Sequence, residues 1–94
     1  MKLVFRQNAV ERMFERGLGV DDVAAALRDG RIIEDYPTDF PYGSALWLGL
    51  AGGKPLHVVA ADNVAVDERI IITVYEPHPA LWESDWATRK KPEL

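Results

Sequence analysis

The sequence contains no cysteine, so neither disulfide bonds nor thiolate-bound zinc can support the small size of its 94 residues. No apolar run approaches membrane-spanning length, and the chain turns polar at Arg6, too early for a signal peptide. We therefore expect a cytoplasmic chain that folds as one domain over residues 1–94. Its ordered core is predicted at about 3–87, with a basic tail at 88–94.

Positive charge is scarce. The formal net charge is −4 and the isoelectric point is about 5.0, which opposes a broad, non-specific attraction to nucleic acid or anionic membrane. The one marked basic cluster is Arg89-Lys90-Lys91. Any RNA site would therefore have to be local.

The usual motifs of cofactor and metal sites are missing. The chain has no P-loop, no GxGxxG and no GxSxG. Its two histidines, His57 and His78, stand in no HxxxH or HExxH spacing. We therefore predict no cofactor and no dedicated metal site, which leaves acid–base chemistry or binding.

The first third of the chain has the apolar spacing of two helices. In residues 9–16 this spacing comes from Val10, Met13 and Phe14, with Asn8 as the expected N-cap and Gly17 as the expected end. A second helix is predicted from about Val20 to Arg28, and Gly30 stops it. We expect both helices to pack on a sheet.

From Arg31 onward the apolar period changes to that of strands. Four are predicted, at 31–36, 45–50, 56–61 and 69–75. Gly52-Gly53 favours an antiparallel hairpin between the second and third, and the short 62–68 connection favours an antiparallel fourth strand. The expected fold is α+β, with two N-terminal helices packed on a curved antiparallel sheet of about four strands.

Polar side chains gather on one face of the last two predicted strands. Alternation places His57 on one face, and a pairing through the 62–68 loop sets it across from about Thr73, with Tyr75 one step along. The same alternation puts Ile70, Ile72 and Val74 on the opposite face. The plain alternative is a half-exposed histidine with a hydroxyl partner and a tyrosine that covers apolar surface.

Two further pairs have helical i, i+4 spacing. Arg12 and Arg16 share a face of the first helix, where two guanidinium groups could hold a phosphate, or could simply pair with nearby acids. Trp82 and Trp86 predict a last helical turn laid against the sheet or a partner, with core packing favoured.

Several segments, taken in order, resemble the domain-of-unknown-function family 4258. They are Asn8-Ala9-Val10-Glu11-Arg12-Met13, Glu15-Arg16-Gly17, Asp22-Val23 with Gly30, Pro55-Leu56-His57-Val58-Val59 and Ile72-Thr73-Val74-Tyr75. The resemblance spans about Phe5 to Trp82. That family looks related to the RelE, MqsR and BrnT toxins, whose fold is two N-terminal helices against a curved antiparallel sheet.

The resemblance implies a toxin-type, metal-independent endoribonuclease, silenced by a cognate antitoxin protein. His57 would be the acid or base when a ribose 2′-hydroxyl attacks its phosphate, Arg12 and Arg16 would stabilise the phosphorane, and Tyr75 would stack on a base or donate a proton. Expected RNA contacts are Asn8, Thr73, Arg89 and Lys90. Asn8 stands where the family usually has a histidine, so one acid–base group is missing.

Two other functions fit the same sequence. A non-catalytic module could hold a protein partner on this sheet face or on the strip around Trp82 and Trp86. A homodimer could form through an open sheet edge at Ile70-Ile71-Ile72, which is apolar on both faces. The sequence alone does not decide between an enzyme and a binding module.

Overall fold

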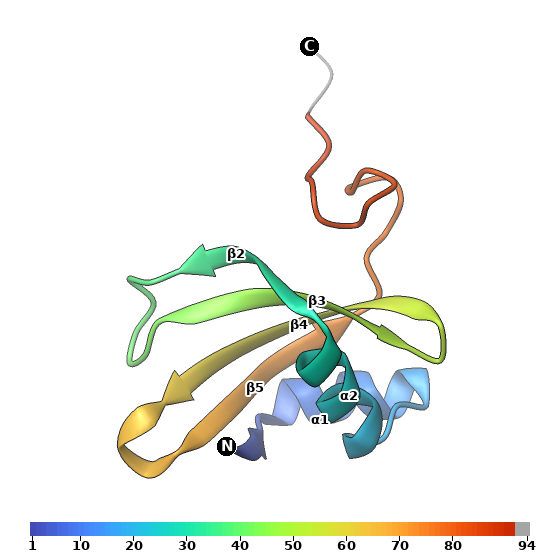
Figure 1. The fold of residues 1–94 in the computed structure, drawn as a ribbon. Coiled ribbons are helices and arrows are strands. Elements are labelled where there is room, and N and C mark those ends of the chain that lie inside the picture. Colours follow the sequence, from blue (N-terminus) through green and yellow to red (C-terminus); the bar gives the residue numbers. More distant parts are fainter. Residues whose placement is uncertain (92–94) are drawn as a thin grey trace.

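The computed structural model describes residues 1–91, which form a five-stranded sheet with two helices on one face (Figure 1). The strands lie in the order β1-β5-β4-β3-β2. Their bounds are β1 Lys2–Phe5, β2 Arg31–Tyr36, β3 Ser44–Ala51, β4 Lys54–Asn63 and β5 Glu68–Tyr75, with a short 3-10 turn at Val64–Val66. This is the α+β architecture that the sequence predicts, with one strand more than expected.

Both predicted helices are confirmed, as α1 Gln7–Arg16 and α2 Val20–Asp29. Gly17 closes α1 in the left-handed conformation, with φ of 66°. The expected N-cap at Asn8 is wrong, because the backbone N–H of Arg6 is bonded to the Ile71 carbonyl at 2.9 Å and the helix begins directly after it. Within residues 1–91 neither helix is long and apolar enough to cross a membrane.

The four predicted strands are confirmed as β2 to β5, each antiparallel to the next along the chain. The β3–β4 hairpin turns at Gly52 and Gly53, whose φ angles of 58° and 80° suit a type I′ turn. These strands therefore form an antiparallel meander.

The fifth strand, β1, was not expected, and it runs parallel to β5. The sheet is therefore mixed, and the prediction of a purely antiparallel sheet is wrong. Because β1 pairs with one side of β5 as far as Ile71 and β4 pairs with the other side, Ile70 and Ile71 lie inside the sheet and not at an open edge. The edge proposed for a homodimer does not exist at this position.

The β4–β5 register also differs from the expected one. His57 pairs with Tyr75, and Val59 pairs with Thr73. An irregularity between Val59 and Ala60 adds a residue to β5, so Ile71 and Val74, and not Ile70, Ile72 and Val74, enter the core under the helices. Simple alternation fails here because a bulge reverses the facing of every residue beyond it.

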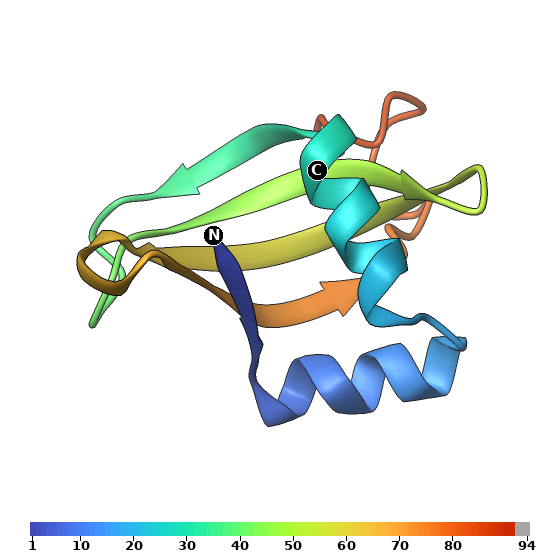
Figure 2. The same ribbon diagram turned by 60° about the horizontal axis from the view of Figure 1, so that its bottom comes forward.

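The helices cover one face of the sheet (Figure 2), and the main core lies between them. Ala9 and Met13 of α1 and Val23 of α2 meet Leu56 and Val58 of β4 there. Gly49 of β3 permits the close approach of α2, because a Cβ at this position would lie 2.2 Å from the Ala26 carbonyl oxygen. The side chain of His57, which alternates with Leu56 and Val58, therefore points to the opposite face, here called the open face.

Residues 76–91, here called the C-terminal segment, cross the open face (Figure 1). The helical turn predicted at Trp82 and Trp86 is wrong: Trp82 forms a β-bridge with Arg89, and Asp85 accepts hydrogen bonds from the Ala87 and Thr88 backbone. The predicted basic tail begins within this segment, yet Arg89 is tied to β2. Residues 92–94 of that tail lie outside the described part of the chain.

Candidate functional site

A polar cluster lies on the open face, beneath the C-terminal segment. It consists of Glu34 and Tyr36 from β2, His57 from β4, Tyr75 from β5 and Arg89 from the C-terminal segment. The strands bring these residues together from positions up to 55 apart in the chain. We call this set the open-face cluster.

His57 lies at the centre of the cluster and is fully buried, with 0% of its surface exposed. Its Nε2 is 2.7 Å from the Trp86 carbonyl oxygen, which can only accept, so Nε2 carries the proton. Its Nδ1, 3.2 Å from the Tyr75 hydroxyl, is then the acceptor of the tyrosine proton. Burial lowers the pKa of His57, which favours the neutral imidazole, and both ring nitrogens are hydrogen-bonded.

Aromatic rings enclose this imidazole. The Trp82 ring stands perpendicular to it with centroids 4.5 Å apart, and the Tyr75 ring is 5.2 Å away at 70°. Trp82 itself is buried, with 3% exposure. Burial raises the pKa of Tyr75, so its hydroxyl keeps its proton. The C-terminal segment thus closes over His57 and excludes water from it.

Arg89 joins the C-terminal segment to β2 through a bidentate ion pair with Glu34. Its Nε and Nη2 donate to the two carboxylate oxygens of Glu34 at 2.7 and 3.0 Å, and its guanidinium lies 4.7 Å from the Trp82 ring centre. The Tyr36 hydroxyl also donates to Glu34. The hydrogen bond from Arg89 lowers the pKa of Glu34, so the carboxylate stays charged.

The sequence-predicted site residues separate into two groups. His57 and Tyr75 come together as expected, whereas Thr73 is two pairs further along and lies beside Val59. Arg12 and Arg16 belong to α1, on the helix side of the sheet, and Arg16 is 3.7 Å from Glu76. The structure therefore does not bring the two α1 arginines into the open-face cluster.

The remaining two expected RNA contacts are also dispersed. Asn8 is exposed in the first turn of α1. Lys90 is exposed on the C-terminal segment, where its backbone N–H donates to the Leu81 carbonyl at 2.9 Å. Of the basic residues predicted from sequence, Arg89 alone lies in the open-face cluster.

Sequence reasoning missed Glu34 and Tyr36. A usable signal was present, since they are two residues apart on a predicted strand and therefore share a face. Their relation to His57 depended on the β2–β3–β4 pairing, which the sequence does not give residue by residue. Within residues 1–91, no three His, Asp or Glu side chains are grouped as metal ligands.

Comparison with known proteins gives one match. The family model described as "Domain of unknown function (DUF4258)" matches residues 5–76, which cover α1 through β5 and end where the C-terminal segment begins. No curated protein and no solved structure matches the chain significantly. The matched region covers most of the chain, so the protein belongs to the family described as Domain of unknown function (DUF4258).

Proposed function

We propose that the protein is a toxin-type, metal-independent endoribonuclease, related to the RelE, MqsR and BrnT toxins and silenced by a cognate antitoxin. The observation that carries the proposal is the open-face cluster. It joins an imidazole, a carboxylate, a guanidinium and two phenols on one face of the sheet. These are the groups that RNA cleavage through a ribose 2′-hydroxyl needs.

The chemistry assigns a role to each group. A neutral His57 takes the proton of the attacking 2′-hydroxyl or, once protonated, gives one to the leaving 5′-oxygen. In the structure Arg89 donates two parallel hydrogen bonds to Glu34. When the C-terminal segment lifts, Arg89 leaves Glu34, and its two parallel N–H donors are then free to bind the charged phosphorane. Once the Trp86 carbonyl leaves Nε2, the Tyr75 hydroxyl accepts from Nδ1–H, and Nε2 is then free to take the proton. Tyr75 alternatively stacks on a base or donates a proton.

The proposal requires the C-terminal segment to lift, because His57 has no exposed surface while the segment lies over it. Over the open face the segment is held by the Trp86 carbonyl on His57, the Arg89–Glu34 pair and the packing of Trp82, and at its start Glu76 pairs with Arg16 of α1. Under this proposal, the form with the segment closed over His57 is the inactive one. Arg12, Arg16, Asn8 and Lys90 then contact RNA phosphates at a distance from the reacting bond.

Expression from a tightly controlled promoter tests the proposal, with growth and whole-cell RNA integrity as the measurements. The wild type is compared with His57→Ala and with His78→Ala, a matched control because His78 is exposed. A fourth variant, Trp82→Ala, uncovers His57 and should be the most toxic per amount of folded protein. We expect RNA loss with the wild type, His78→Ala and Trp82→Ala, and none with His57→Ala. Intact RNA with folded wild type and folded Trp82→Ala refutes the proposal.

A second function is favoured by the complete burial of His57 and the bonding of both of its nitrogens. In that case His57 only stabilises the fold by bonding the C-terminal segment to the sheet. The protein is then a non-catalytic module that binds a protein partner or a second copy of itself. It predicts that folded His57→Ala loses stability but changes no RNA. Size measurement of the purified wild type separates a homodimer from a monomer that awaits another partner.

A further inference from the structure

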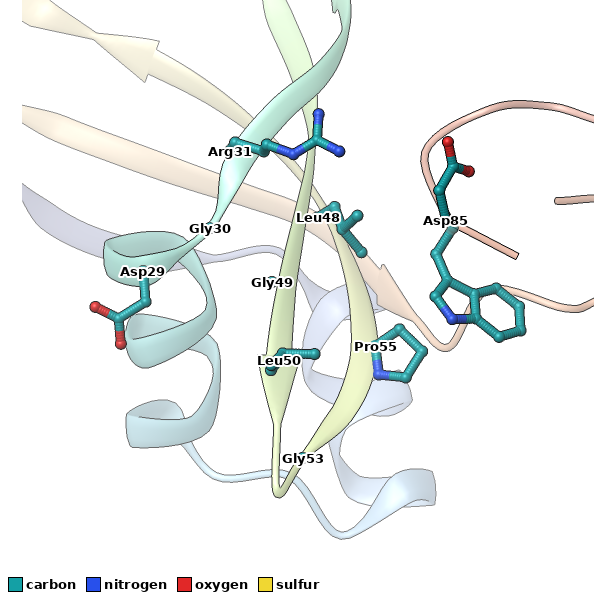
Figure 3. A pocket seen from close by; sticks show the side chains of 10 residues that line it. Asp29, Gly30, Arg31, Leu48, Gly49, Leu50, Gly53, Pro55 and Asp85 are labelled. Atoms are coloured by element: carbon teal, nitrogen blue, oxygen red, sulfur yellow. The ribbon is translucent and has the colours of Figure 1, made fainter. Parts of the chain in front are cut away.

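Two of the hollows beside the strands differ in what they can hold. The larger, of about 520 Å³, lies between the β3–β4 hairpin and the C-terminal segment (Figure 3). Its single guanidinium, Arg31, is set against the carboxylates of Asp29 and Asp85, so its charges select no class of ligand. The smaller, of about 190 Å³, lies between the β2–β3 loop, residues 37–43, and the strands β4 and β5. It is below the roughly 300–1,000 Å³ of small-molecule sites, and it suits a single side chain.

The floor of the smaller hollow is apolar and belongs to the open face. It is made of Ala61 from β4 and of Ile70 and Ile72 from β5. Ala61 lies four residues after His57 on the same strand, and side chains alternate along a strand, so both point to the open face. Ile70 pairs with Ala61 and points the same way. The hollow is therefore an apolar hole in one face of the sheet.

The β2–β3 loop forms the rim of this hollow and is tied down at two points. The Tyr42 hydroxyl accepts a hydrogen bond from Asn63 Nδ2 at 2.8 Å, which joins the loop to the end of β4. The Ser44 hydroxyl donates to the Asp39 carboxylate. Phe40 stands between these two points in the chain and is 95% exposed. The loop therefore presents a phenyl ring to solvent on a backbone that both bonds hold in place.

The exposed ring belongs to a wider apolar surface. Figure 1 and Figure 2 both show the β2–β3 loop and the β4–β5 connection at the same end of the sheet. Val64 and Val66 of that connection follow Asn63 directly and are 81% and 59% exposed. Burial of such a surface against another molecule is favourable, and an apolar patch of this kind marks an interaction site.

Two opposite charges flank the hollow. Arg6 and Asp39 both line it. Within residues 1–91 they form no ion pair with each other. One positive and one negative charge cancel, so this surface has no net attraction for RNA phosphates. Each charge can instead pair with the opposite charge on a second copy of the same surface.

The surface is complementary to itself. A two-fold interface uses the same patch on both copies, so each projecting group must find its receptor on that patch. Here the projecting Phe40 stands at the rim of a hollow of the size of one side chain, and Arg6 shares that hollow with Asp39. Both halves of an apolar contact and both halves of an ion pair are therefore present on one chain.

We propose that two copies of the chain dock about a two-fold axis through this surface, here called the loop patch: Arg6, Asp39, Phe40 and the floor of the hollow. Phe40 of each copy enters the hollow of the other, and Arg6 of each pairs with Asp39 of the other. The contact uses side chains of the open face and not the backbone edge expected from sequence. It does not rest on the ribonuclease proposal, because His57 is not part of the loop patch.

The dimer should be weak. Its contact consists of one loop and a few strand residues on each copy, so its area should fall below the roughly 1,200 Å² at which stable interfaces begin. We expect a dissociation constant on the order of 10–100 μM, with monomer in excess at low concentration.

Sedimentation equilibrium of the purified wild-type protein, from about 5 μM to about 1 mM, measures this constant. Phe40→Ser is compared with Phe14→Ser, a matched control because Phe14 is 88% exposed on α1, outside the loop patch. Phe40→Ser should weaken dimerisation by about tenfold or more, since it removes the aromatic anchor, and Phe14→Ser should leave it unchanged. A wild type that stays monomeric throughout, or equal constants for the two variants, overturns the proposal.

A charge exchange tests the two-fold geometry. Arg6→Glu and Asp39→Arg each set like charges against one another across the interface, so each variant alone should be monomeric at about 100 μM. In an equimolar mixture the two introduced charges face each other and so do the two native ones, and a dimer with one copy of each should form. Lys54→Glu, the same charge change on the exposed start of β4, should dimerise like the wild type.

Failure of the mixture to dimerise, with both variants folded by circular dichroism, overturns the two-fold arrangement. Phe40 is almost wholly exposed, so Phe40→Ser should keep the fold and remain decisive if a charge variant does not fold. Because no RNA is present in either experiment, these outcomes are independent of whether the protein cleaves RNA.

Discussion

Replacement of Trp82 by alanine should detach the C-terminal segment while the sheet and helices remain folded. Burial of Trp82 contributes roughly 1.5–3 kcal/mol to closure. The His57–Trp86 hydrogen bond adds about 0.5–1.5 kcal/mol. The Arg89–Glu34 pair adds less than about 1 kcal/mol, because the Arg89 side chain is 60% exposed and solvent screens it. Trp82 therefore supplies the largest single contribution to closure, so its loss should open the segment.

The same contact free energies also limit how far Trp82→Ala can lower the free energy of unfolding of the whole protein. The main core lies on the other face of the sheet, between the helices and residues such as Leu56 and Ile71, and Trp82 does not contact it. The free energy of unfolding should fall by no more than the contact free energy of the segment, about 3–5 kcal/mol. Replacement of a tryptophan in the main core by alanine would instead lower the free energy of unfolding by that amount or more, and no segment would open separately from global unfolding.

The assay is an NMR titration of the His57 ring, run beside urea unfolding. In the wild type, burial lowers the pKa of His57 below its usual value. In Trp82→Ala the uncovered imidazole should return to a pKa of about 6.5. His78→Ala serves to assign the two histidine signals. A Trp82→Ala protein whose His57 pKa stays low, or whose unfolding free energy drops by more than about 5 kcal/mol, would show that the segment belongs to the main core.

Two further predictions concern the loss of stability at acid pH and the close packing of α2 on β3. Burial lowers the pKa of His57 in the folded protein, so the stability that the neutral ring contributes is present above its ordinary pKa of 6.5 and is lost as the pH falls through the pKa of the folded state. Urea unfolding should therefore show a less stable protein at acid pH. His57→Gln should abolish this loss. Glu34, whose pKa is lowered by its bond to Arg89, adds a second loss below 4.5. Gly49→Ala should destabilise the protein by about 3 kcal/mol or more, because its Cβ would lie 2.2 Å from the Ala26 carbonyl oxygen and force α2 from the sheet. Gly19→Ala, whose Cβ meets nothing closer than 3.7 Å, should cost less than about 1 kcal/mol in the same urea series; equal losses in the two variants would contradict this reasoning.

Most of the secondary structure was readable from the sequence. Apolar residues at helical spacing and the left-handed Gly17 marked α1, and Gly52-Gly53 marked the β3–β4 hairpin. These signals are local, so they act within a few residues of the structure they produce. The strand β1 was not predicted, because its four residues are too few to show a clear apolar alternation. Its partner strand β5 is 66 residues away in the chain.

The bulge in β5 had a larger effect on the site. Without the bulge the Ala60–Ile71 register would continue to a His57–Val74 pair, and the added residue places Tyr75 opposite His57 instead. A single added residue in one strand has almost no sequence signature here, since Ile70, Ile71 and Ile72 are identical. The composition of the cluster was therefore only partly predictable, although the importance of His57 and Tyr75 was.

The sequence by itself determined the α+β class, two helices, four of the strands and the face of β4 on which His57 lies, because these depend on residue periodicity and turn chemistry. Tertiary structure alone decided the partners of that face. It brought Glu34 from β2 and Arg89 from beyond β5 together, although they are 55 residues apart, and it folded the C-terminal segment over His57. Contacts at such separation arise from the packing of whole elements, and no local pattern in the chain encodes them.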